Sequence, residues 1–263
     1  MYSHATNEAS TGAASNPLPP SPPPDDFAEL ELAMRKTSKQ YSFASSSIVT
    51  VVVGKEKRKY HLHKVLLKNP SLAGAFFPKC LSVPMKDWIE LPEDNSVAVD
   101  HFVRLLYGQP NFGSAIADDG YVLGRMHAWV FGNKICCPQL QNHVMIGILG
   151  YWKKWEMNPA LFGWVIEKLE AQSPLFNAAR DQMRFALARG SKNELYGADG
   201  KFGSTFQRLR QKHSDLVWEV VLAAMEQLRN QNFQNPFDQA DRYRVNPLPT
   251  NSQDSVLRGR GQN

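Results

Sequence analysis

The feature that most constrains the fold is a run of β-branched residues from Ile48 to Val53, ended by Gly54. β-branched side chains favour extended backbone, and a glycine commonly stands where a buried strand enters a turn. Residues 60–63 then alternate between apolar and polar side chains, as a returning strand does. The charged residues 55–59 between these segments therefore predict a solvated hairpin turn, and not a phosphate-binding strip.

Two short helices and a third strand are predicted after the hairpin. Residues 64–68 have the pattern of one short helix, and residues 69–71 break it because they hold a proline between two capping residues. A second short helix is expected to run from Leu72 to Phe76. Residues 88–91 then predict a short strand, which completes a small sheet.

Longer helices fill the rest of the sequence. One is expected after the capping residues 92–96, and it ends near Tyr107. After two more helices, the second of them opened by Pro138, the pattern is wholly helical from Asn158 onward. Ser173-Pro174 and Ser214 are plausible helix starts, and the predicted buried stripes are Leu161/Val165/Leu169, Leu175/Ala179/Met183 and Val217/Val221/Met225/Leu228.

Several segments in this order resemble the BTB/POZ domain, in the form common in large families of fungal BTB proteins. The resemblance runs from about Ser45 to Trp152, and the helices after it look like the extension that often follows such domains. The matching segments are Ile48-Val-Thr-Val-Val-Val-Gly54, His61-Leu-His63-Lys64-Val-Leu-Leu67, Leu72 to Phe77, Ile89-Glu-Leu-Pro-Glu-Asp94, Phe102-Val-x-Leu-Leu-Tyr-Gly108, and Val130-Phe-Gly-Asn-Lys134 followed by Pro138-Gln-Leu-Gln-Asn142.

The resemblance implies an α/β (α+β) fold in which helical hairpins cover a small sheet, followed by an all-α C-terminal extension. We therefore place the BTB/POZ-like domain at 41–152 and the helical extension at 153–232. Residues 1–40, which are polar and rich in proline, are expected to be disordered. Residues 233–263 lack hydrophobic periodicity and are expected to form a disordered tail.

The function implied by the resemblance is noncatalytic protein–protein interaction, as a homo-oligomeric adaptor or scaffold. His63 with Lys64 falls on the family's His-basic pair, whose histidine is a structural group that anchors the second strand to the first helix. The candidate dimer interface comprises Phe43, Ile48, Val65 and Leu66. The candidate partner-binding region comprises Phe102, Tyr107, Gln109 and Phe112.

Two departures from the family pattern bear on the choice of partner. Ser47 stands where the family usually has an aspartate that forms a charged pocket with the basic residue at Lys64. The loop at 108–113 has no hydrophobic-x-Glu motif, which is a common contact of members that recruit a cullin scaffold. A substrate adaptor of a cullin-based ubiquitin ligase, holding an unknown client protein, is therefore kept as an alternative to a self-associating scaffold.

Enzymatic motifs are absent from the sequence. It contains no phosphate-binding GxxxxGK[ST], no GxGxxG after a strand, no GxSxG elbow and no HExxH. His61 and His63 share one face of a strand, but two histidines leave half of a tetrahedral metal site unfilled. We expect no catalytic residues, no cofactor and no metal.

Charge and hydropathy limit the remaining classes of partner. The formal net charge of +5 is spread thinly and forms no basic arm, so nucleic acid is not the expected partner, although a transcriptional regulator or nucleic-acid-associated protein stays a further alternative. No apolar run is long enough for a membrane span, and the N-terminus has no signal-peptide pattern. A cytoplasmic or nuclear protein is expected.

Cysteines and tryptophans are interpreted as packing groups. Cys136 and Cys137 lie between two apolar helices, where small buried side chains are expected. Three tryptophans near the boundary of the two domains are expected to join the helical extension to the first domain. They are Trp152, Trp155 and Trp164, and Asp118-Asp119 is expected to cap a helix.

Overall fold

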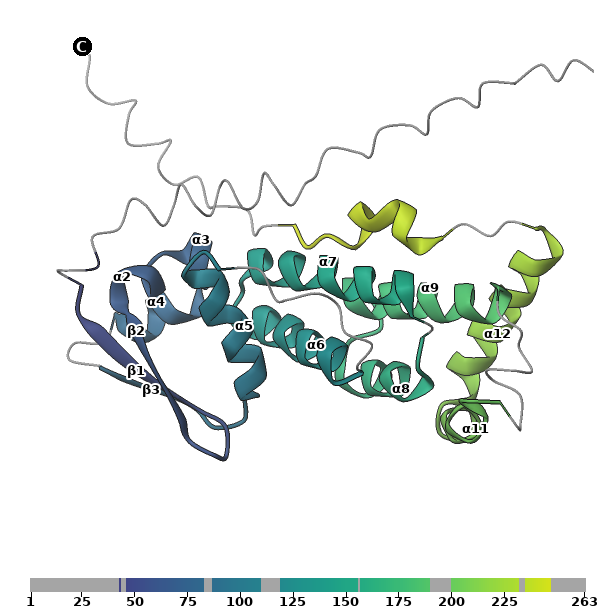
Figure 1. Ribbon diagram of the computed structural model, residues 1–263, viewed down its shortest axis with the longest axis horizontal. Helices are drawn as coiled ribbons and strands as arrows, with labels where there is room; N and C mark the ends of the chain where they lie inside the picture. Colours follow the sequence, from purple (N-terminus) through teal and green to yellow (C-terminus); the bar gives the residue numbers. More distant parts are fainter. Residues whose placement is uncertain are drawn as a thin grey trace, which may run out of the picture.

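The computed structural model describes residues 43, 46–82, 87–109, 119–155, 157–189, 200–231 and 235–246. This part of the chain is mixed α/β, with a small sheet at one end of an elongated body (Figure 1). The strands are β1 (Ile48–Val53), β2 (Arg58–His63) and β3 (Trp88–Leu91). The helices are α2 (Lys64–Leu67), α3 (Pro70–Ala73), α4 (Phe76–Leu81), α5 (Ser96–Leu106), α6 (Asp119–Lys134), α7 (Pro138–Lys154), α8 (Pro159–Lys168), α9 (Pro174–Arg189), α11 (Gly203–Lys212), α12 (Ser214–Arg229) and the 3-10 helix η2 (Pro236–Tyr243).

The predicted hairpin is confirmed, and β1 is its central strand. The strand order is β2-β1-β3, with β1 antiparallel to β2 and parallel to β3. Gly54 and Lys57 begin and end the turn with φ angles of 70° and 53°, a region that favours glycine. The N–H of Gly54 donates to the carbonyl of Leu91 at 2.9 Å, so the turn is also fastened to the end of β3.

An apolar core lies between the sheet and the helices beside it. Val49, Val51 and Val53 of β1 have no exposed surface. The rings of Phe77 in α4 and Phe102 in α5 stack with centroids 5.3 Å apart. Phe102 also meets Phe131 of α6 edge to face, with centroids 5.6 Å apart, so three helices contribute aromatic rings to one cluster.

Gly74 brings the short helices against the end of α6. Its φ angle is 72°, and a Cβ atom at this position would lie 2.2 Å from the carbonyl oxygen of Ile135. That same carbonyl accepts the backbone N–H of Phe76 at 3.3 Å. Because any side chain at residue 74 would collide with backbone, only glycine permits this contact.

The helix starts predicted at Asn95, Asn158 and Ser173 are confirmed, whereas the helix expected from Leu72 to Phe76 is divided at Gly74 into α3 and α4. The side chain of Asn95 accepts the N–H of Val97 at 2.8 Å, and Asn158 caps α8 in the same way. The hydroxyl of Ser173 accepts the N–H of Phe176 at 3.3 Å at the start of α9. Pro138 occupies the first position of α7, where its missing N–H costs no hydrogen bond.

The predicted buried stripe of α12 is wrong at Met225, whereas Val217 is buried and Val221 and Leu228 are partly buried against the core. The structure buries Val217, Val220 and Ala224 on the side that packs on α9, whereas the side chain of Met225 is 53% exposed. Small side chains at a helix contact allow the axes to come close, and Ala224 provides one. The apolar spacing therefore included Met225, which is exposed, and left out Ala224, which is buried.

The prediction of a disordered tail from residue 233 is wrong for residues 235–246. They contain η2, which lies along α7 and α9 (Figure 1). The amide of Asn142 in α7 donates to the carbonyl of Val245 at 3.0 Å and accepts its N–H at 2.7 Å. Side-chain hydrogen bonds to backbone thus hold a segment that has no apolar periodicity. The expected disorder of residues 1–40 lies outside the described residues.

Candidate protein-interaction surfaces

His63 joins the sheet to α5 through one tyrosine. Its Nδ1 lies 2.8 Å from the hydroxyl of Tyr107, and that hydroxyl oxygen also accepts the backbone N–H of His63 at 3.3 Å. The Tyr107 hydroxyl thus contacts both the backbone and the ring of His63, and the tautomer of the ring sets the direction of the bond to Nδ1. The ring of Phe43 packs on both, with centroids 4.9 Å from His63 and 6.1 Å from Tyr107. We call these three residues the aromatic cluster.

Lys64 has an acidic partner that the resemblance does not predict. Its ammonium group forms an ion pair with Asp87, and its backbone N–H donates to the carbonyl of Ser47 at 2.9 Å. Asp87 comes directly before β3, and its carbonyl accepts the N–H of Thr50 at 2.9 Å. The parallel register of β1 and β3 therefore brings a carboxylate to Lys64 although residue 47 is serine.

Of the four residues predicted to form the dimer interface, three are at least partly exposed and one is buried in the core. Ile48 is 43% exposed, and Phe43 and Val65 are half-buried. The assignment of Leu66 to the interface is wrong, because Leu66 has no exposed surface. The single turn of α2 directs its side chain into the core and leaves Val65 at the edge of the core. The other three residues stay a prediction.

Trp88 is an exposed apolar residue beside Ile48 that the sequence interpretation missed. It is 43% exposed, and it lies opposite Thr50 in the register of β1 and β3. Because side chains two residues apart on a strand share a face, Ile48 and Trp88 lie on the same face of the sheet. The ammonium of Lys59 lies 5.6 Å from the Trp88 ring. The two-residue period of the predicted strand was the available signal, because it places Trp88 on the same face as the charged Glu90.

The predicted partner-binding region is largely internal. Phe102 has no exposed surface and belongs to the aromatic core, so it cannot contact a partner in the folded chain. The reason lies in its own sequence pattern, since it is part of the apolar stripe of α5. Tyr107 is half-buried in the aromatic cluster, and Gln109 is exposed. Phe112 lies outside the described residues.

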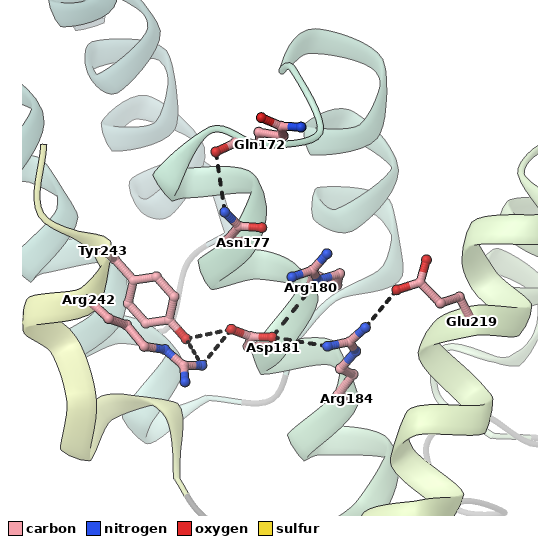
Figure 2. Close-up of polar contacts among 8 residues, drawn as sticks. All are labelled: Gln172, Asn177, Arg180, Asp181, Arg184, Glu219, Arg242 and Tyr243. Atoms are coloured by element: carbon pink, nitrogen blue, oxygen red, sulfur yellow. Dashed lines mark hydrogen bonds and ion pairs between the residues drawn. The ribbon is translucent and has the colours of Figure 1, made fainter.

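At the other end of the molecule, Asp181 of α9 is the centre of a polar network that includes side chains of α9, η2 and α12 (Figure 2). Its carboxylate accepts the hydroxyl of Tyr243 at 2.8 Å and also pairs with Arg242, both from η2. Arg184 reaches Asp181 at 3.4 Å and Glu219 of α12 at 2.7 Å. We call these five residues the Asp181 network. Burial and the nearby carboxylate raise the pKa of Tyr243, which keeps its hydroxyl a donor.

The tryptophans at the domain boundary differ in their surroundings. Trp152 is buried, and its carbonyl accepts the amide of Gln182 in α9 at 3.2 Å. Trp164 of α8 packs edge to face on His127 of α6, with centroids 4.9 Å apart. These two contacts join α8 and α9 to α6 and α7. Trp155 is 40% exposed and does not fit the predicted packing role well.

The adjacent cysteines also differ from each other. Cys137 has no exposed surface, its thiol donates to the carbonyl of Leu72 at 3.4 Å, and burial raises its pKa to about 11. Cys136 is exposed, with a positive φ angle of 56°. The packing role is therefore confirmed for Cys137 and wrong for Cys136. The predicted cap at Asp118 lies outside the described residues.

Comparison with family models, with curated proteins and with solved structures gave no match for this chain. Among the described residues, no group of three or more His, Cys, Asp or Glu side chains is placed to hold a metal ion. No helix in the same part of the chain is long and apolar enough to cross a membrane.

Proposed function

We propose that this chain is a noncatalytic protein-interaction module of the BTB/POZ type, which associates with itself and acts as an adaptor or scaffold in the cytoplasm or nucleus. The observation that carries the proposal is the position of His63. It ends β2, begins α2 and binds Tyr107 at the end of α5. This is the anchoring role that the resemblance implies for it.

The surface beside this anchor supports self-association. Ile48 and Trp88 expose apolar area on one face of the sheet, and Phe43 and Val65 lie at its edge. An apolar centre with a charged border is the usual composition of a protein interface, and Lys64 with Asp87 supplies such a border. A twofold contact would use the same patch on both copies.

The test is light scattering on the full chain, comparing wild type with Ile48→Asp. Because Ile48 is exposed, its replacement leaves the core intact, whereas Val65→Asp is a second, more invasive variant. Val97→Asp is the matched control, since Val97 is 46% exposed on α5. We expect Ile48→Asp to lower the assembly mass and Val97→Asp to leave it unchanged. Equal masses for wild type, Ile48→Asp and Val97→Asp would overturn the proposed interface.

A second arm adds the N-terminal domain of the cullin used by BTB ligases. A complex with one cullin fragment per chain would establish the ubiquitin-ligase adaptor alternative. An assembly that does not bind the cullin fragment favours the self-associating scaffold over the ligase adaptor. A titration with duplex DNA at two salt concentrations tests the regulatory alternative, because phosphate contacts make affinity fall steeply with salt.

A further inference from the structure

Helix α12 presents a second apolar face that no described element covers. Trp218, Leu222 and Met225 are spaced one and two turns apart and are 58%, 50% and 53% exposed, respectively. They are the most exposed large apolar side chains of the described residues. Val217 and Val220 on the other side of the helix are buried. Figure 1 shows α12 at the end of the molecule opposite the sheet. We call Trp218, Leu222 and Met225 the α12 stripe.

The charges around the stripe select the class of partner. Along the exposed side of α12, three carboxylates accompany one cation, and one of the carboxylates, Glu219, is paired with Arg184 of α9. Anionic membranes and nucleic acids are bound through clusters of lysine and arginine, whereas α12 has one arginine and no lysine. An apolar stripe on a helix fits another protein helix instead. The charged residues are Asp215, Glu219, Glu226 and Arg229.

The order of the charges identifies the partner as a second copy. Asp215 and Arg229 are exposed at opposite ends of the stripe, and Leu222 lies about two turns from each, roughly 10.5 Å along the axis. An antiparallel pair of α12 helices would place each Asp215 beside the Arg229 of the other copy and would oppose the helix dipoles. A parallel pair would bring like charges together at both ends.

We propose that α12 is a self-association surface, in which two copies pack their stripes antiparallel about a twofold axis through Leu222. The contact is isologous, so each copy contributes the same residues. A stripe of three side chains is smaller than a standard interface and belongs to the weak, transient class. The surface is independent of the sheet end, so a chain that carries both surfaces forms assemblies larger than a dimer.

The first test is sedimentation equilibrium of the full chain with Leu222→Asp, alone and combined with Ile48→Asp. The matched control is Ile146→Asp, since Ile146 is 36% exposed on α7. We expect Leu222→Asp to weaken one association step by at least about tenfold and Ile146→Asp to leave it unchanged. We also compare Ile48→Asp with the double variant Ile48→Asp/Leu222→Asp. Any self-association that the single variant retains and the double variant loses is assigned to α12. Equal association with and without Leu222→Asp overturns the proposal, even if the sheet-end interface holds.

The second test determines the orientation by disulfide formation. In a chain with Cys80→Ser and Cys136→Ser, Leu222→Cys should form a disulfide-linked dimer, because the residue on a twofold axis faces itself and comes within reach of an S–S bond. Asp215→Cys should not, because it faces residue 229 of the other copy. Crosslinking of both variants indicates a parallel pair, and crosslinking of neither indicates no pair; either result overturns the proposal.

Discussion

Both ends of the molecule contribute to the apolar core, but they differ in the polar contacts that are added to it. At the sheet end, the core consists of apolar side chains with no exposed surface, centred on the rings of Phe77 and Phe102. At the helical end, α12 buries Val217, Val220 and Ala224 against α9, and the Asp181 network, whose central carboxylate is still 17% exposed, adds polar contacts from η2 and α12 to α9. Apolar burial scales with area, whereas a polar network depends on each of its members. We therefore expect the sheet end to unfold as one unit and η2 to detach separately.

The largest expected effect comes from removing a ring at the sheet end. Phe102→Ala deletes a fully buried side chain that contacts Phe77 and Phe131, and should lower the free energy of unfolding by about 4 kcal/mol. Val97→Ala on the same helix is the control, because Val97 is exposed, and it should change stability by less than about 0.5 kcal/mol. Urea unfolding measures both. Equal losses would refute an apolar core centred on Phe102.

The second-largest expected effect is a loss of folding stability in acid. Burial, together with Arg125, Arg104 and His143, lowers the pKa of His101 from 6.5 to about 4. Between these values the unfolded chain binds the proton and the folded chain does not, so stability falls as pH decreases from about 6.5 to about 4. The loss is about 3 kcal/mol for this group. Urea unfolding of His101→Gln should depend less on pH over this range. An unchanged slope would contradict the assignment.

A smaller and more local effect is expected for Asp181→Ala. It removes the acceptor of Tyr243 and Arg242 and should cost about 2 kcal/mol. Hydrogen exchange should accelerate at residues 236–245 and stay unchanged in β1. Asp241→Ala is the control, since Asp241 is 81% exposed in its pair with Arg244. If both variants behaved alike, the Asp181 network would not be what holds η2.

The smallest expected effect is modification of Cys136. Its thiol is exposed, so iodoacetamide should label it in the folded protein and change stability by less than about 0.5 kcal/mol. Cys137 should react only after unfolding, because it is buried with a raised pKa. Mass spectrometry of the labelled peptide distinguishes the two. Rapid labelling of Cys137 in native buffer would show that the packing around it opens easily.

The sheet end could be predicted because its determinants are local. The valine run, Gly54 and the cap at Asn95 each act on residues nearby in the sequence. These local signals predicted the strands and helix starts that the structure contains. They did not predict which residues of a helix reach the surface, so Leu66 and Phe102 were assigned to interfaces although both belong to the core.

The helical end was harder to predict because its contacts join distant residues. Asp181 meets Tyr243 across 62 positions, and Asn142 meets Val245 across 103. No spacing rule connects such pairs, so residues 235–246 were predicted to belong to a disordered tail. The α12 stripe was missed for a related reason. The exposed side of α12, with Trp218 and Leu222, is defined by the side that packs on α9, where Val217, Val220 and Ala224 are buried. That packing is not encoded in the spacing of apolar residues.

The most direct test of self-association is light scattering of the wild-type full chain over a wide concentration range. One chain has a mass of 29.6 kDa. We predict a dimer at low concentration and a mass that rises above that of a dimer as the second, weaker surface becomes occupied. A mass that stays at 29.6 kDa throughout the range would contradict both proposed surfaces and, with them, the proposal of a self-associating module.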